Sequence, residues 1–143
     1  MGETVAAGAV VAWCVALSVS DVRHRRLPNV LTLPGALVML LGAAAVGRGL
    51  PAVAGAGVLF AVYAAVHLVS PSAMGAGDVK LAIGLGALTG GFGSQIWLPA
   101  ALGAPLLSGV WAVAILALRS KQTVPHGLSM CVASMAAVAP AVL

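Results

Sequence analysis

The chain has 143 residues, of which 62% are hydrophobic and only 7% are charged. A soluble domain carries about 25% charged residues, so too little polar surface is present here to face water on all sides. The net charge of +4 rests on a few basic residues between apolar stretches, which fits orientation in a membrane better than binding to nucleic acid. The composition predicts an all-α integral membrane protein with one domain, residues 1–143, and no room for a separate soluble domain.

Six apolar stretches predict about six transmembrane helices joined by short loops. Such a helix needs roughly 20 apolar residues, so a chain of this length holds at most six. We expect Pro28 in the first turn of the second helix, with Asn29 satisfying exposed amides there. Pro99 and Pro105 are expected to bend the fifth helix. The first five predicted spans are residues 4–20, 30–46, 52–69, 79–88 and 95–118, and the sixth follows the loop at residues 119–125 and continues to residue 143.

The fourth span is short and rich in glycine, between a loop at residues 70–77 and a break at residues 89–93. A helix of about 14 residues covers about 21 Å, whereas the hydrocarbon core of a bilayer is about 30 Å thick. We therefore expect this helix to be tilted, to be buried among its neighbours, or to stop short of the far face.

The basic residues orient the six predicted spans. The loops after the first, third and fifth spans lie on one side, and Arg48 and Glu3 lie on the other. By the positive-inside rule the first side is cytoplasmic and both termini face outward. The expected location is therefore the inner (cytoplasmic) membrane, crossed several times. Six of the seven basic residues lie on the cytoplasmic side: Arg23, Arg25, Arg26, Lys80, Arg119 and Lys121.

The chain has three acidic residues, Glu3, Asp21 and Asp78. Because Glu3 lies near the N-terminus, chemistry that needs two fixed carboxylates must use the other two. They are 57 positions apart (78 minus 21), yet the number of intervening spans places both at the cytoplasmic face. Burying an ionised group in a membrane costs several kcal/mol, so such residues are functional candidates.

Two carboxylates that reach one water can divide acid and base catalysis. The ionised one accepts a proton from the attacking water, and the protonated one donates to the oxyanion or the leaving amine. Close carboxylates share a proton and titrate as a unit. The helix dipole alone favours ionisation at Asp78, which does not decide the roles. Taken singly, Asp78 also fits a helix N-cap and Asp21 a solvated loop residue.

Three motifs carry a resemblance to a known family. Residues 75–80, Gly-Ala-Gly-Asp-Val-Lys, match the GxGDxK signature of the type IV prepilin peptidases, which are membrane-embedded aspartic proteases. Asp21, followed by basic residues and Leu-Pro-Asn at 27–29, is similar to the family's first motif. Residues 124–127, Val-Pro-His-Gly, resemble its Pro-aromatic-Gly motif. The resemblance covers essentially the whole chain.

The resemblance implies that Asp21 and Asp78 are the catalytic pair. The substrate it implies is a prepilin-like or pseudopilin precursor whose short leader is cut after a Gly, before an apolar helix, at the cytoplasmic face. Gly75 and Gly77 would let the backbone bring Asp78 close to its partner or to the substrate. Lys80 would hold a helix end or a carboxylate, or serve as an interfacial anchor.

This chain departs from the family pattern at two positions of the last motif. His126 replaces the usual aromatic residue and Leu128 the usual proline, so a contact there is expected to be lost or changed. The cytoplasmic insert with cysteine pairs found in long members is absent from this sequence. The chain thus resembles the short, peptidase-only branch associated with Flp/Tad-type pili, and methylation is not predicted.

The other polar residues predict neither a metal nor a cofactor. Cys14 and Cys131 lie in apolar spans without metal-ligand spacing and are expected to be buried thiols. His67 is expected to be a hydrogen-bonded structural residue or to line the site, and His24 and His126 are expected to be loop residues.

Two rival classes predict other features. A proton or cation relay, or a transporter subunit, predicts acids near the bilayer midplane and an internal repeat, neither of which the sequence has. An inert membrane assembly protein predicts that Asp21→Asn and Asp78→Asn leave function intact. The paired motifs favour the aspartic endopeptidase.

Overall fold

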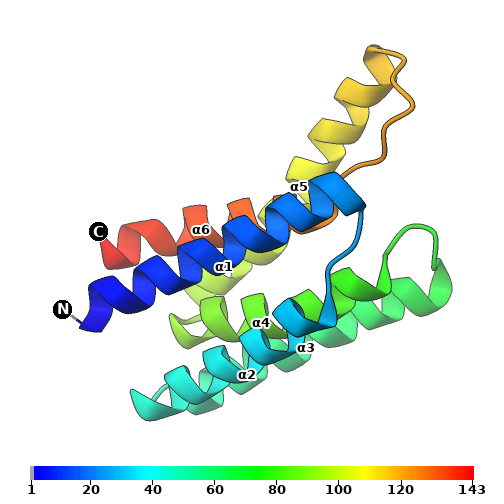
Figure 1. Ribbon diagram of the computed structural model, residues 1–143. Coiled ribbons are helices and arrows are strands. Elements are labelled where there is room, and N and C mark those ends of the chain that lie inside the picture. The colour runs from blue at the N-terminus through cyan, green and yellow to red at the C-terminus, as the bar shows by residue number, and fades with distance from the viewer. Residues whose placement is uncertain (1) are drawn as a thin grey trace.

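The computed structural model describes residues 2–143, and over this range the chain forms six α-helices and no strand. Successive helices run in alternating directions, so the start of α1 and the C-terminus lie at the same end of the bundle (Figure 1). The all-α prediction is confirmed. The helices are α1 (Gly2–His24), α2 (Asn29–Ala45), α3 (Gly49–Val69), α4 (Ala76–Gly91), α5 (Ser94–Ala117) and α6 (His126–Val142).

The helix ends differ from the predicted spans by a few residues, and two of these differences move the acids. α1 continues to His24 and ends where Arg25 adopts a left-handed conformation, with φ of 54°. Asp21 therefore lies in the last part of the helix and not in the loop. α4 begins at Ala76, so Asp78 lies in its first turn. At the other end, Gly93 with φ of 102° separates α4 from α5.

α4 is the central helix of the bundle and packs against α2, α3, α5 and α6. Most of its residues are buried, from Val79 to Gly90, because small residues on several faces let the neighbouring helices approach closely. The short fourth helix is therefore buried among its neighbours, which is one of the three arrangements expected from its length.

The closest helix pair, α3 and α4, meets through glycines. A Cβ atom at Gly86 would lie 2.7 Å from the carbonyl oxygen of Gly55, and one at Gly90 would lie 2.8 Å from that of Pro51. Both contacts are with backbone, which cannot rotate away as a side chain can. Glycine is therefore needed at these positions for α4 to reach its place in the bundle.

We expect Gly86→Ala to destabilise the protein by about 3 kcal/mol, because the added methyl forces α3 and α4 apart. The matched control is Gly57→Ala on α3, where a Cβ atom meets nothing within 4 Å. Alanine favours a helix by about 1 kcal/mol over glycine, so this control should be neutral or stabilising. Thermal unfolding in detergent micelles measures both variants, and equal melting temperatures would contradict the packing described here.

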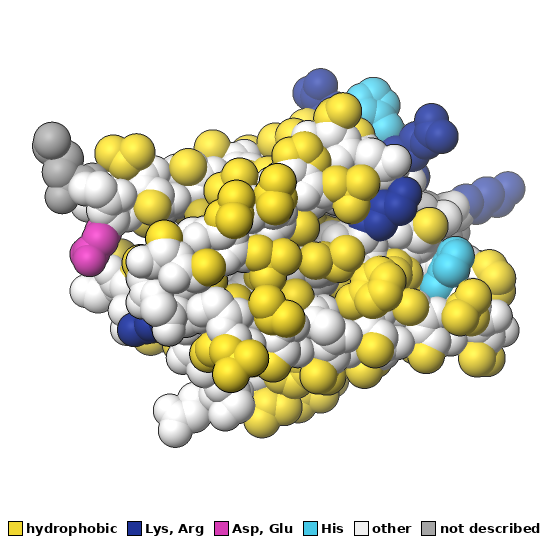
Figure 2. Space-filling model, turned by 90° about the horizontal axis from the view of Figure 1, so that it is seen from below, with side chains coloured by type: hydrophobic (Ala, Val, Ile, Leu, Met, Phe, Trp, Pro, Cys, Tyr) yellow, Lys and Arg dark blue, Asp and Glu magenta, His cyan; other side chains and the backbone are white. Residues whose placement is uncertain are grey.

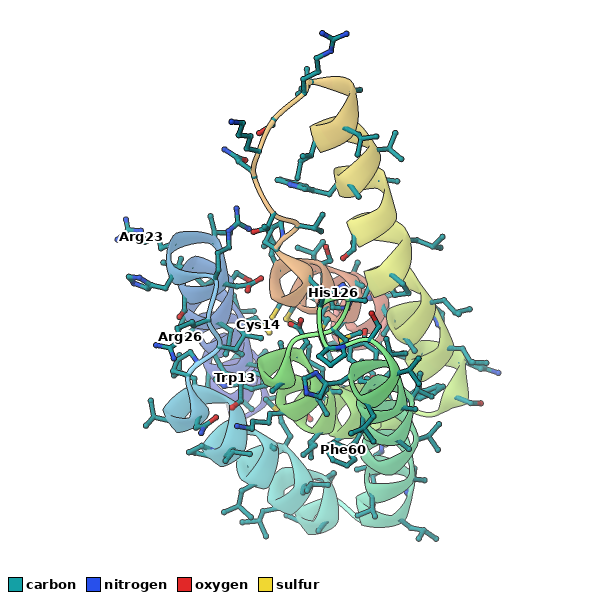
Figure 3. The ribbon with its side chains drawn as sticks, turned by 90° about the vertical axis from the view of Figure 1, so that its right-hand side faces the viewer. Trp13, Cys14, Arg23, Arg26, Phe60 and His126 are labelled. Carbon is teal, nitrogen blue, oxygen red and sulfur yellow. The ribbon has the colours of Figure 1, made fainter. Side chains whose placement is uncertain are left out.

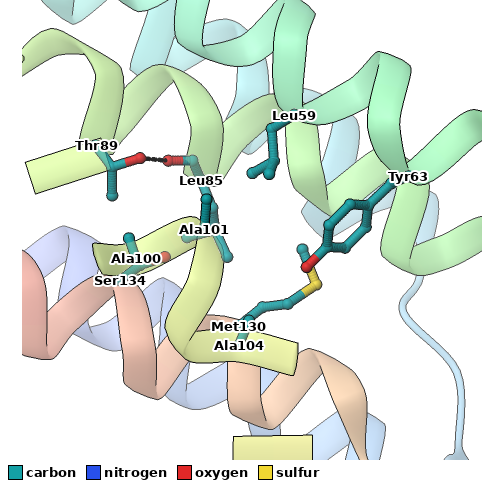
Figure 4. A pocket seen from close by; sticks show the side chains of 9 residues that line it. All are labelled: Leu59, Tyr63, Leu85, Thr89, Ala100, Ala101, Ala104, Met130 and Ser134. Atoms are coloured by element: carbon teal, nitrogen blue, oxygen red, sulfur yellow. Dashed lines mark hydrogen bonds between the residues drawn. The ribbon is translucent and has the colours of Figure 1, made fainter. Parts of the chain in front are cut away.

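The centre of the bundle is tightly filled where α3, α4, α5 and α6 meet (Figure 4). The space left there is about 10 Å³, room for one water at most. Thr89 satisfies its hydroxyl within α4 by donating to the Leu85 carbonyl at 2.7 Å. Tyr63 extends from α3 toward Met130 of α6. This packing fixes α6 relative to α3 and α4.

Three helices, α1, α3 and α5, are long and apolar enough to cross a membrane, and α2 and α6 are shorter apolar helices. The prediction of six spans is thus matched by the number of helices but not by their lengths. Figure 1 shows that α5 changes direction, as expected from Pro99 and Pro105 within it. Figure 2 shows that the basic side chains gather mainly at the end of the bundle opposite the termini.

An apolar groove of about 490 Å³ runs between α1 and α2, with the second half of α4 as its floor. Trp13 lies at its side and donates from Nε1 to the Leu31 carbonyl at 2.7 Å. Arg48 lies at its rim, and its guanidinium is 5.7 Å from the centre of the Phe92 ring. The lining contains no carboxylate, so the acids lie elsewhere in the bundle.

Candidate active site

Asp21 is buried beneath the start of α6 although it lies on α1. Its side chain is 7% exposed, whereas Arg23 and Arg26 point away from the bundle (Figure 3). The amide N–H of Leu128 donates to Asp21 Oδ2 at 3.2 Å. This contact joins residues 107 positions apart in the sequence. The structure therefore excludes a freely solvated loop residue at position 21.

Gly127 permits the close approach of α6 to Asp21. A Cβ atom at position 127 would lie 3.0 Å from Asp21 Oδ2 and 3.1 Å from the Leu27 side chain. Both distances are shorter than ordinary contacts. The glycine of the Pro-His-Gly segment thus has a steric role directly at the carboxylate.

Asp78 lies on the third residue of α4, after Gly75 at the N-cap position. No side chain caps this helix, so Asp78 is not its N-cap residue. Burial raises the pKa of Asp78 to about 6, helped by the negative charge of Asp21, while a hydrogen bond from the Gly75 backbone lowers it in part. Burial and the neighbouring charge thus outweigh the helix dipole. Asp21 is therefore close enough to act on the ionisation of Asp78.

Leu27 covers this part of the bundle from the loop between α1 and α2. Leu27 is buried and lies between two glycines of the motifs. Its side chain is near Gly127, and a Cβ atom added at Gly77 would lie 3.1 Å from the Cβ atom of Leu27. Gly77 is thus needed for the loop to pack against α4. The three segments that carry the resemblance meet at this leucine.

A second contact joins the first two motifs. Lys80 donates from Nζ to Asn29 Oδ1 at 2.9 Å, between α4 and the first residue of α2. Asn29 does not satisfy free amides as expected, because Pro28 is the N-cap residue and its carbonyl accepts from Leu31 and Thr32. The partner of Lys80 is thus an amide side chain at the start of α2, a helix end and not a carboxylate, and the contact ties the α1–α2 loop to α4.

His126 is the first residue of α6, so the predicted loop position is wrong. Figure 3 shows it within the bundle, where α6 meets α3 and α5. Its Nε2 lies 3.1 Å from the Tyr63 hydroxyl, and its Nδ1 lies 2.6 Å from Ser108 Oγ. The Tyr63 and His126 ring centres are 5.6 Å apart.

The other two histidines have different surroundings. His67 donates from Nδ1 to the Met74 carbonyl at 2.5 Å, so the expectation of a hydrogen-bonded structural residue is confirmed. His24 is exposed at the end of α1 and is helical, contrary to the loop position expected. Across residues 2–143, no three His, Cys, Asp or Glu side chains lie together in a way that could hold a metal ion.

The sequence did not reveal several residues around the pair. Leu27 was part of a motif without a role of its own, and Tyr63 and Ser108 carried no pattern that singled them out. The one available signal was the departure at His126 and Leu128, which indicated a changed contact. The change is the hydrogen bond from Leu128 to Asp21, since a proline there would have no N–H to donate.

Comparison with known proteins places the chain in a family. The family model of the type IV leader peptidase family matches residues 8–114, which includes both Asp21 and Asp78. The match ends before α6, so the contacts of His126 and Leu128 lie outside it. No curated protein and no solved structure matches the chain. Because the match covers most of its length, the chain belongs to the type IV leader peptidase family.

Proposed function

We propose that this protein is a membrane-embedded aspartic endopeptidase that removes the short N-terminal leader of prepilin-like precursors. The observation that supports this most is the pairing of Asp21 and Asp78, the two acids remote from the N-terminus, at the basic end of the bundle. The family match supports peptidase activity in general. The cut is proposed to follow a Gly at the cytoplasmic face, and the short peptidase-only branch is the proposed place in the family.

The position of the pair at one end of the helices suits a substrate with a polar leader and an apolar helix. Water and the leader reach the acids from the cytoplasm, while the apolar helix of the precursor stays in the bilayer. A relay or transporter would need acids near the midplane, and both acids lie near helix ends. This placement supports hydrolysis at the membrane boundary.

In the proposed mechanism Asp21 is the general base and Asp78 the general acid. Asp21 accepts a proton from the water that attacks the carbonyl carbon of the scissile bond, and Asp78 donates a proton to the carbonyl oxygen. Collapse of the tetrahedral intermediate breaks the C–N bond, and the leaving amine takes up a proton from the acid pair. The raised pKa of Asp78 supports its protonated role, and the hydrogen bond from Leu128 supports the ionised form of Asp21.

The direct test is cleavage of a co-expressed candidate prepilin in membranes, followed by mass spectrometry of the product. We expect a mass loss equal to the leader and a new N-terminus immediately after a Gly. A matched precursor with that Gly replaced by a bulky residue should remain uncut. An unchanged precursor mass with several Flp-type prepilins, despite correctly inserted enzyme, would refute the proposal.

The pH profile tests the assignment of the acid. Below about pH 6 Asp78 is protonated and can donate, and above this value it loses the proton, so kcat/KM should fall as pH rises through about 6. The profile is measured with purified enzyme and prepilin from about pH 5 to about pH 8. A kcat/KM that stays level or increases over this interval would show that Asp78 does not act as the acid in the free enzyme.

A further inference from the structure

The first turn of α6 presents an amide directly to Asp21. Leu128 is the third residue of the helix, and the amides of a first turn have no partner within the helix. The first intrahelical bond of α6 runs from the Ser129 amide to the Pro125 carbonyl, one residue later. The Leu128 N–H is therefore available to another acceptor, and Asp21 Oδ2 takes it at 3.2 Å.

His126 holds the same turn in place, because its two hydrogen-bond partners lie on two other helices. The imidazole lies between the hydroxyls of Tyr63 on α3 and Ser108 on α5, at 3.1 Å and 2.6 Å. A neutral imidazole has one donor and one acceptor nitrogen, and each hydroxyl is able to fill either complementary role. Both ring nitrogens are thus satisfied, and α6 is tied to two helices two residues before the amide that reaches Asp21.

We propose that His126 and Leu128 are positioning residues: the Tyr63–His126–Ser108 network fixes the start of α6 so that the Leu128 amide orients Asp21 and holds it as the ionised base. The proposal rests on the proposed function for its catalytic part. Its structural part, the dependence of the amide contact on His126, is independent of any activity.

Because the contact with Asp21 is made by the backbone N–H of residue 128, the orientation of Asp21 depends on that N–H and not on the side chain at this position. Leu128→Pro removes the N–H that Asp21 accepts, and proline is tolerated in the first turn of a helix. Leu128→Ala keeps the N–H and shortens the side chain, so it is the matched control. A lost hydrogen bond to a charged group corresponds to an effect of about tenfold to a hundredfold, and the 3.2 Å contact is expected at the lower end.

Steady-state cleavage of a prepilin provides the first test. We expect Leu128→Pro to lower kcat about tenfold with KM changed less than about twofold, and Leu128→Ala to stay close to wild type. Melting temperatures measured on the same samples separate positioning from unfolding. A folded Leu128→Pro enzyme with wild-type kcat, or a Leu128→Ala enzyme as slow as it, would overturn the proposal.

The second test replaces the imidazole and then its partners. His126→Phe keeps a ring but leaves the Tyr63 and Ser108 hydroxyls without their partner, so kcat should fall about tenfold. The triple variant His126→Phe/Tyr63→Phe/Ser108→Ala lacks the unpaired hydroxyls, so its folding stability should recover. The first turn of α6 is still not held by hydrogen bonds in this variant, so kcat should stay low. Exposed His24→Phe serves as the control and should match wild type. Full recovery of kcat in the triple variant would show that the network only contributes stability.

A third measurement needs no substrate and also applies if proline at position 128 prevents folding. Amide hydrogen exchange of Leu128, followed by NMR in micelles, reports its bond to Asp21. We expect exchange about tenfold faster in His126→Phe and in Asp21→Ala, and little change in Asp21→Asn, whose side-chain carbonyl still accepts. Unchanged exchange in His126→Phe would refute the link between the network and the amide. If no prepilin is cut but this pattern holds, the proposed function fails and the structural link stands.

Discussion

Replacing either Asp21 or Asp78 by asparagine is expected to reduce prepilin cleavage about a thousandfold or more. Acid–base catalysis by one positioned group contributes about 10²- to 10⁴-fold, and neither role is possible for a neutral amide. Asparagine keeps the volume of aspartate, and at position 21 its carbonyl still accepts from the Leu128 amide. The loss should therefore reflect chemistry and not folding.

The pairing makes a further prediction about additivity. If the two carboxylates act as a unit on one water, the Asp21→Asn/Asp78→Asn double variant should be about as slow as either single variant. Glu3→Gln is the matched control, because it removes the third acid of the chain, which is exposed near the N-terminus. The measurement is the rate of leader loss with equal amounts of membrane-inserted enzyme.

Two outcomes would contradict the paired mechanism. Wild-type rates in Asp78→Asn would make Asp78 a structural residue of the first turn of α4, where its carboxylate meets the Gly75 backbone. Wild-type rates in Asp21→Asn would reduce the Leu128 contact to a packing role. In either case a single carboxylate, or none, would be catalytic, and the proposed mechanism would be wrong.

The meeting of the two acids could be predicted because it depends on an even number of helices between them and not on where each helix begins or ends. Asp21 and Asp78 lie 57 positions apart, and two helices that reverse the chain between them return it to the same end. An error of several residues at any helix end does not alter this result. The prediction therefore held although α1 extends to His24 and α4 begins at Ala76.

The contacts around the pair could not be predicted in the same way, because they depend on how helices pack in three dimensions. Tyr63 and His126 are 63 positions apart, and Leu128 and Asp21 are 107 positions apart. No local period or spacing links such residues. The short length of α4 likewise allowed three arrangements, and only the glycine contacts with α3 show that it is enclosed.

The electrostatics at Asp78 could be predicted only in part from the sequence. A position in the first turn of a helix favours the charged carboxylate, by typically 0.3–1 kcal/mol at an exposed site. In the folded chain, burial and the charge of Asp21 act in the opposite direction and raise the pKa of Asp78. Burial depends on the neighbouring helices, so the balance between these effects becomes visible only in the structure.

Among the glycines near the site, Gly127 should be the most sensitive to substitution. Its missing side chain leaves the space that Asp21 Oδ2 and Leu27 occupy, at 3.0 Å and 3.1 Å from an added Cβ atom. Gly127→Ala forces the carboxylate to move by a few tenths of an ångström, and Gly127→Val by more. A displacement of about 1 Å can lower a rate about 10²-fold, so we expect kcat to fall about tenfold for alanine and about a hundredfold for valine.

The graded series separates displacement of Asp21 from general damage to the bundle. The matched controls are Gly8→Ala and Gly8→Val. Gly8 is on the same helix as Asp21, and a Cβ atom there meets nothing within 4 Å, so both controls should cleave at the wild-type rate. KM should change little in the Gly127 series, because the apolar helix of the precursor does not depend on the carboxylate position. If Gly127→Val cleaves as fast as Gly8→Val, Asp21 does not need the position that α6 gives it, and the catalytic importance of this close approach is excluded.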